Sequence, residues 1–262
     1  MFSATLFFGL LSISTKVFAA GPCPPNLNTF ADYAILGANG AYDSDSTVSQ
    51  ITGDVGSVSG SLGINATLST DGTYSTSPIV TGKIYTGNYV SPTPAKLQTG
   101  LADLHTAYND LMGRTSPNFV NLNGGNLGGR TLSPGLYNFP GGVTISSTLT
   151  ITGSANDYYI FQIQGALNHY SQIVLSGGII PENIFWGVAG TATFYATSHF
   201  EGILIGGGPV WFQDYGTGDD RIPLSGTGRF ASFAFVEFQD ATIISREWRG
   251  FDSCRELAMT AL

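Results

Sequence analysis

The second half of the chain repeats itself, and this repeat limits the folds that the sequence can adopt. The matching segments are 149–153 with 173–177, 157–165 with 182–190, and 200–205 with 228–233. The copies recur at spacings of about 20 to 28 residues, which is typical of a β-solenoid whose coils stack on one another. The alternative is an antiparallel sandwich, which needs a turn signal about every 8 to 12 residues.

The composition fits a stack of coils. The chain contains 35 glycines in 262 residues, and each coil must turn several corners, some of which require a positive φ. Only 11% of the residues are charged. A low charge is expected because stacked coils place like side chains above one another, where like charges repel. We therefore predict a mainly β fold, a β-solenoid.

One stretch has a helical period instead. After Pro92, apolar residues follow at alternating steps of four and three: Leu97, Leu101, Leu104, Tyr108 and Leu111. Thr93 can cap the N-terminus, with Pro94 at the first helical position, and Gly113 ends the run. We expect a helix over about 94–113. Its single apolar stripe should pack along the rest of the domain.

Charge and composition exclude several functions. The 18 acidic and 10 basic residues give a net charge of −8 without a basic run, which excludes a nucleic-acid partner. The hydrophobic content of 42% is too high for a disordered chain. Two cysteines are too few for a four-cysteine zinc site, and the three histidines lack ligand spacing. The sequence contains no phosphate-binding or dinucleotide motif, so we expect no metal and no cofactor.

The N-terminus resembles a secretory signal peptide over residues 1–19. The apolar stretch 6–11 is too short to span a bilayer, and 17–19 fits a small-residue cleavage site. We expect cleavage after residue 19 or 20, a secreted extracellular protein and no membrane partner. A single domain should cover 20–244, followed by an extension over 245–262. The alternative is an uncleaved, buried N-terminal strand.

Two covalent modifications would accompany secretion. Cys23 and Cys254 can form a disulfide in an oxidising compartment, or they can remain two unpaired thiols. Asn65 begins the one Asn-x-Ser/Thr sequon of the chain and can accept a glycan if the host glycosylates it.

An ordered set of motifs resembles the microbial ice-binding proteins of cold-tolerant fungi, bacteria and diatoms. The resemblance extends from about residue 27 to residue 243. The matching segments are 30–37, 51–56, 80–85, 92–94, 107–108, 113–114, 126–129, 132–137, 160–162, 175–178, 183–186 and 197–202. It implies an irregular right-handed β-helix with one α-helix alongside. It also implies a monomer, not an enzyme, whose partner is an ice crystal surface with its ordered water.

Ice adsorption requires a flat, rigid and weakly hydrated face. Strand alternation predicts which side chains point outward, and the resemblance points to this outward column and adds Asn39 and Ala41 from the N-terminal coil. The candidate ice-binding residues are Asn39, Ala41, Ala166, Asn168, Thr191, Thr193, Tyr195, Pro209, Trp211, Gln213, Phe235 and Glu237. A neighbouring column is expected to continue the same strands, with Thr148, Thr150, Thr152, Val174 and Ser176. The alternative is a solvated sheet face whose threonines reflect β propensity.

The candidate face differs from that of other family members, which usually have small residues at six of its positions. In this chain those positions hold Asn39, Tyr195, Pro209, Trp211, Phe235 and Glu237. The Glu237 carboxylate should bind water tightly, and Trp211 and Phe235 should protrude and roughen the face. The segment 214–223 is more charged than the family's turn. We therefore expect ice binding that is moderate or confined to part of the face.

Two other functions are weighed against ice binding. A β-helical polysaccharide lyase or hydrolase needs converging carboxylates, and Asp214, Asp219 and Asp220 are better explained as a solvated loop. A secreted adhesin or glycan-binding solenoid would use exposed aromatic residues as stacking platforms. The aromatic residues that would serve it, Tyr195, Trp211 and Phe235, are the same residues that argue against a flat ice-binding face.

Overall fold

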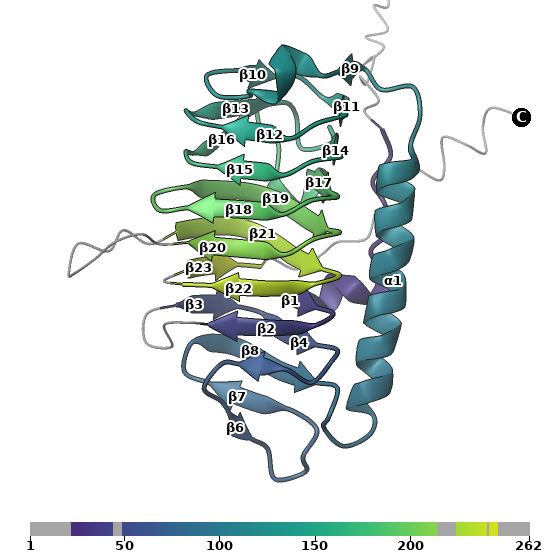
Figure 1. Cartoon of the computed structure of the whole chain (residues 1–262), viewed down its shortest axis with the longest axis vertical. Helices are drawn as coiled ribbons and strands as arrows, with labels where there is room; N and C mark the ends of the chain where they lie inside the picture. Colours follow the sequence, from purple (N-terminus) through teal and green to yellow (C-terminus); the bar gives the residue numbers. More distant parts are fainter. Residues whose placement is uncertain (1–21, 44–48, 214–223, 240, 246–262) are drawn as a thin grey trace, which may run out of the picture.

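The chain forms a β-solenoid with one long helix along its side (Figure 1). The computed structural model describes residues 22–43, 49–213, 224–239 and 241–245. Within these residues most strand pairings are parallel and join one coil to the next, while β6–β7 and β7–β8 are antiparallel. The predicted mainly β solenoid is therefore confirmed, and the alternative of an antiparallel sandwich is wrong.

Three sheets form the sides of the solenoid in the described residues. The helix-side sheet contains β1 (Tyr33–Gly37), β3 (Gln50–Thr52), β4 (Asp54–Ser57), β6 (Thr67–Leu68), β7 (Ser75–Ser77), β8 (Val80–Thr86), β9 (Phe119–Val120), β11 (Gly135–Phe139), β14 (Tyr159–Ile163), β17 (Ile184–Val188), β19 (His199–Gly206), β21 (Leu224–Ser232) and β23 (Ala241–Ile244). The seven-stranded sheet contains β2 (Gly40–Asp43), β5 (Leu62–Gly63), β12 (Val143–Ile145), β15 (Leu167–His169), β18 (Ala192–Tyr195), β20 (Val210–Gln213) and β22 (Phe235–Phe238). The three-stranded sheet contains β10 (Thr131–Leu132), β13 (Leu149–Thr152) and β16 (Ile173–Ser176).

The helices are one α-helix, α1 (Thr93–Gly113), and three short 3-10 helices, η1 (Asn28–Asp32), η2 (Leu122–Gly125) and η3 (Pro181–Asn183). The predicted helix is confirmed, and it ends at Gly113 as expected. The predicted N-cap is wrong, because the cap position is Pro92 and the Thr93 hydroxyl donates instead to the carbonyl oxygen of Thr73. None of the described helices is both long and apolar enough to cross a membrane.

The order of the coils in space differs from their order in the chain. β1 pairs with β4 on one side and with β21 on the other, and β2 and β3 pair with β22 and β23. The N-terminal coil therefore stacks directly on the last coil. α1 runs along the stack and carries the chain from the end that holds β8 to the opposite end, where β9 begins (Figure 1).

Two hydrophobic cores hold this arrangement together. The first fills the inside of the solenoid, and the second lies between α1 and the helix-side sheet. Leu97, Leu104 and Leu111 of the predicted stripe are fully buried in the second core, against residues such as Phe185 of β17. Strands β14 and β17 of the helix-side sheet are buried on both faces, with α1 covering their outer side, whereas the seven-stranded sheet supplies a long face that is free of the helix.

The contact between α1 and the helix-side sheet depends on a glycine. A Cβ on Gly187 would lie 2.1 Å from Cδ2 of Leu111 and 2.6 Å from Sδ of Met112. We expect Gly187→Ala to lower the free energy of unfolding by about 1–3 kcal/mol, because the added methyl overpacks this contact. Urea unfolding measures the change. Gly113→Ala is the matched control, since a Cβ there meets no atom within 4 Å, and equal losses in both variants would contradict the prediction.

Several sequence predictions fall outside the described residues. They are the signal peptide, the C-terminal extension from residue 246, Asp214, Asp219, Asp220 and Cys254. Cys23 is exposed, and its pairing with Cys254 stays a prediction. Asn65 is exposed between β5 and β6, where a glycan would have room, so this site stays a prediction as well.

Candidate functional site

The outward side of the seven-stranded sheet, called the outer face below, carries side chains in straight columns. Pairing in register places the central column in the order Thr144, Asn168, Thr193, Trp211, Glu237, Tyr42 and Gly63. The alternate positions point inward and are fully or almost fully buried: Val143, Leu167, Ala192, Val210, Val236 and Ala41. Strand alternation therefore produces a core side and a solvent side on every coil.

Two further columns flank the central one. On one side, strand register and backbone hydrogen bonds place Ala166, Thr191, Pro209, Phe235 and Gly40 next to one another. On the other side lie Tyr170, Tyr195 and Gln213. The Tyr170 and Tyr195 rings stack with centroids 4.0 Å apart and an interplanar angle of 11°, so each covers one ring face of the other.

Ten of the twelve predicted residues take outward positions on this face: Ala166, Asn168, Thr191, Thr193, Tyr195, Pro209, Trp211, Gln213, Phe235 and Glu237. Asn39 is exposed just before β2, and its side-chain amide donates to the carbonyl oxygen of Phe233 at 3.4 Å. The prediction for Ala41 is wrong, because this residue is 0% exposed and pairs in register with buried Val236.

Sequence reasoning missed three residues of the outer face: Tyr42, Thr144 and Tyr170. Tyr42 takes the outward position predicted for Ala41. Thr144 lies in register with Asn168, and carrying the repeat back by one coil would have identified it. No comparable signal existed for Tyr42, because its place depends on how the N-terminal coil stacks on the last one.

Large aromatic side chains of adjacent coils pack on one another on the outer face. Trp211, Phe235 and Tyr42 are all half-buried. The Trp211 and Phe235 rings meet edge to face at 4.9 Å, and the Tyr42 and Phe235 rings meet edge to face at 6.0 Å. Trp211 and Phe235 therefore do not extend freely into water, because aromatic rings in adjacent coils gain more by packing on one another than by full exposure. That they roughen the face stays a prediction.

The outer face consists of two halves. The small-residue half consists of the central column and the Ala166 column on β12, β15 and β18. It presents Thr144, Ala166, Asn168, Thr191 and Thr193 without a formal charge, and the stacked pair of Tyr170 and Tyr195 borders it. The aromatic half, formed by β20, β22 and β2, presents Pro209, Trp211, Phe235, Glu237 and Tyr42. Glu237 lies in register between Trp211 and Tyr42, and neither ion pair found in the described residues involves its carboxylate.

The predicted neighbouring column belongs to a different side of the solenoid. Thr150, Thr152, Val174 and Ser176 lie on the three-stranded sheet, and Thr148 directly precedes it. The expectation that this column continues the same strands is wrong, since the chain bends between β12 and β13 and starts a new side. These threonines therefore form a separate surface.

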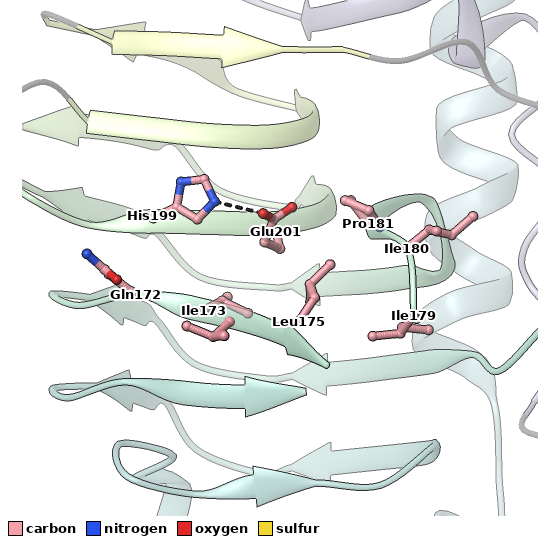
Figure 2. A pocket seen from close by; sticks show the side chains of 9 residues that line it. Gln172, Ile173, Leu175, Ile179, Ile180, Pro181, His199 and Glu201 are labelled. Atoms are coloured by element: carbon pink, nitrogen blue, oxygen red, sulfur yellow. Dashed lines mark hydrogen bonds and ion pairs between the residues drawn. The ribbon is translucent and has the colours of Figure 1, made fainter. Parts of the chain in front are cut away.

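A shallow pocket lies beside the three-stranded sheet (Figure 2). Its lining includes Ile173, Leu175, Pro181, His199 and Glu201, and Figure 2 shows the last two side chains directed toward each other. His199 Nε2 and Glu201 Oε1 are 2.7 Å apart. The other two histidines lie elsewhere, and the described residues contain no group of three or more His, Cys, Asp or Glu side chains that could hold a metal ion. The pocket thus brings together one His–Glu pair and several apolar side chains.

Comparison with known proteins adds to this geometry. Residues 35–232 match the model of a family described as ice-binding-like. The chain belongs to this family. The resemblance inferred from the sequence is therefore confirmed.

Individual relatives in the ice-binding-like family cover most of the chain. An ice-binding protein of Flammulina populicola is 40% identical over 243 residues, which are 90% of this chain and 93% of that protein. Ice-binding protein K1-A of Typhula ishikariensis is 40% identical over 214 residues, 78% of this chain and 86% of that protein. Among solved structures, an ice-binding protein from an Arctic yeast, studied for its antifreeze activity, superimposes with a TM-score of 0.80 at 32% identity, covering 87% of this chain and 97% of its own.

Proposed function

We propose that this protein is secreted and adsorbs to ice through the outer face, and that adsorption inhibits ice growth and recrystallisation. The observation that supports this most directly is the three-column face on a rigid sheet, in a chain of the ice-binding-like family. Each contact with ordered water is weak, so such a face must supply area. Seven strands about 4.8 Å apart give a face about 29 Å long between the outermost strands.

The small-residue half has the chemistry that ice contact needs. Threonine and alanine present methyl groups with few hydroxyls, which leaves the bound water weakly held. The parallel ladders hold these groups at fixed spacings from coil to coil. The proposal requires no catalysis, no metal and no cofactor, and it assigns ice as the partner of a monomer.

The experiment is ice-affinity partitioning of the recombinant chain without residues 1–20, together with a recrystallisation assay. Protein incorporated into a slowly growing ice hemisphere, and grains that stay small at micromolar concentration, are the expected results. Exclusion from the ice together with normal recrystallisation would overturn the proposal.

The aromatic half supports a second candidate, a glycan-binding solenoid. The observation that favours it is the contiguous set of half-exposed Trp211, Phe235 and Tyr42 rings, which meet edge to face on the outer face. Sugar rings stack on aromatic faces, and apolar patches mark interaction sites. Pull-down on insoluble polysaccharides, run beside the ice-affinity assay, separates the two functions, because each predicts retention on a different solid.

Glu237 is the one formal charge in the three columns of the outer face. We expect Glu237→Gln to raise ice activity by about twofold or more, because the neutral amide no longer holds the tight hydration shell of a carboxylate. Recrystallisation inhibition as a function of protein concentration measures the effect. Glu182→Gln on η3 removes the same charge away from the face and serves as the control. An unchanged or lower activity of Glu237→Gln would show that this carboxylate does not weaken adsorption.

A further inference from the structure

Tyr42 lies on the outer face above two glycines. A Cβ built on Gly63 would lie 2.7 Å from Cδ1 of Tyr42, closer than real Cβ contacts allow. A Cβ built on Gly40 would lie 2.5 Å from both Cε2 and the phenol oxygen of Tyr42. The ring therefore occupies the space that a side chain at either position would need.

The two glycines hold the ring from different directions. Gly40 is two residues before Tyr42 on β2, so the two residues share a face, and Gly63 is the register partner of Tyr42 on β5. The phenol hydroxyl donates to the carbonyl oxygen of Asn39 at 3.3 Å, which places the ring tip over the start of the strand. Tyr42 is thereby directed along the strand rather than away from the sheet.

Tyr42 is less exposed than an aromatic residue of the outer face that has no glycine beneath its ring. Tyr170, in the flanking column, is 44% exposed, whereas Tyr42 is half-buried. The lower exposure of Tyr42 agrees with a ring that lies in the space left by the two glycines. Tyr42 also packs edge to face with Phe235, and Phe235 packs edge to face with Trp211. The three rings therefore form one continuous cluster.

We propose that Gly40 and Gly63 are positioning residues that lay Tyr42 flat and so extend the ice-contact surface over the aromatic half. This inference rests on the proposed ice binding. Its physical basis is that a rigid face contacts a crystal only where no side chain stands above its neighbours. A gap of about 0.5–1 Å already loses a quarter to a half of a dispersion contact. Glycine is required because any Cβ at these two positions would lift the ring.

Gly63→Ala tests the proposal most directly, since no positive φ constrains this position and the shortest contact of the added Cβ is with the Tyr42 ring. We expect a loss of about half of the ice activity, in proportion to the area of the aromatic half, because many weak contacts add up with area. Gly141→Ala is the matched control: it is exposed, it meets no atom within 4 Å, and it lies near the other end of the same sheet. This control should keep full activity.

A double-mutant cycle with Tyr42→Ala distinguishes positioning from a general effect on the edge strand. Without the ring, an added methyl at position 63 has nothing to lift, so Gly63→Ala should have no further effect on ice activity in the Tyr42→Ala background. Equal losses in both backgrounds, or a fall in the thermal midpoint that accounts for the lost activity, would overturn the inference. Full activity of Gly63→Ala would overturn it as well. If the unmodified chain does not bind ice, the proposed function itself fails, which is a different outcome.

Discussion

Thr193→Tyr should remove most of the ice activity of this protein. Thr193 is in the centre of the outer face, between Asn168 and Trp211 in register, and is only 8% exposed. Because Thr193 already has almost no free surface, the much larger tyrosine ring cannot fit between its neighbours and part of it must extend above the face. We expect a loss of about tenfold or more, because dispersion contacts fall steeply with separation and an upright ring holds the whole face away from the ice.

The matched control for this variant is Thr150→Tyr. Thr150 also points outward from a strand, but it lies on the three-stranded sheet beside Val174. Its substitution by tyrosine should leave ice activity unchanged. Recrystallisation inhibition measures both variants, and the thermal midpoint confirms that each is folded. Full activity of Thr193→Tyr, or a large loss in Thr150→Tyr alone, would show that ice binds to another side of the solenoid.

Acid should destabilise the fold through one buried histidine. His169 is 0% exposed inside the solenoid, where burial lowers its pKa from the ordinary value of 6.5 to about 4. Its Nε2 lies 3.1 Å from the carbonyl oxygen of His199, and its Nδ1 has no hydrogen-bond partner among the described residues. The ring is therefore neutral in the folded protein at neutral pH.

The direction of the effect follows from the two protonation states. Well above pH 6.5 neither the folded nor the unfolded chain protonates this residue, so it makes no pH-dependent contribution there. As the pH falls from 6.5 to about 4, the unfolded chain gains a proton that the folded chain excludes, and unfolding becomes more favourable. At about 1.4 kcal/mol per pH unit, the expected loss across this interval is about 3 kcal/mol.

The His169 prediction is tested by urea unfolding at several pH values between 7 and 4. His169→Gln, which keeps a donor for the His199 carbonyl, should flatten the pH dependence by about the predicted amount, while carboxylates titrate alike in all variants. His105→Gln is the control, because His105 is exposed on α1 and stacks on Phe233. A pH dependence in His169→Gln equal to that of the unmodified chain would contradict the prediction.

Much of the fold could be derived from local patterns. The repeat in the second half predicts the stacked coils, and strand alternation within these coils places residues such as Thr193 and Trp211 correctly on the outside. The apolar spacing of Leu97, Leu104 and Leu111 predicts both the helix and its buried side. These inferences succeed because side-chain direction in a strand or helix depends on neighbours a few residues away.

The errors concern residues whose surroundings come from distant parts of the chain. Ala41 faces the core and Tyr42 faces outward because β2 pairs in register with β22, 195 residues later. The threonines around Thr150 are a local exception: they form a separate side because the chain bends at 146–148, between β12 and β13. Trp211 and Phe235 are half-buried because they pack edge to face on aromatic neighbours in adjacent coils. None of these contacts can be derived from a single coil.

By itself the sequence determined the repeating coils, the helix alongside them and the outward columns of the later coils, since all three arise from periodic patterns within short segments. The tertiary structure decided how the N-terminal coil docks on the last coil and, through this docking, how far the outer face extends. It also decided that Gly40 and Gly63 leave room for the ring of Tyr42. The physical reason is that flatness is a property of neighbouring coils packed together, and no single segment contains it.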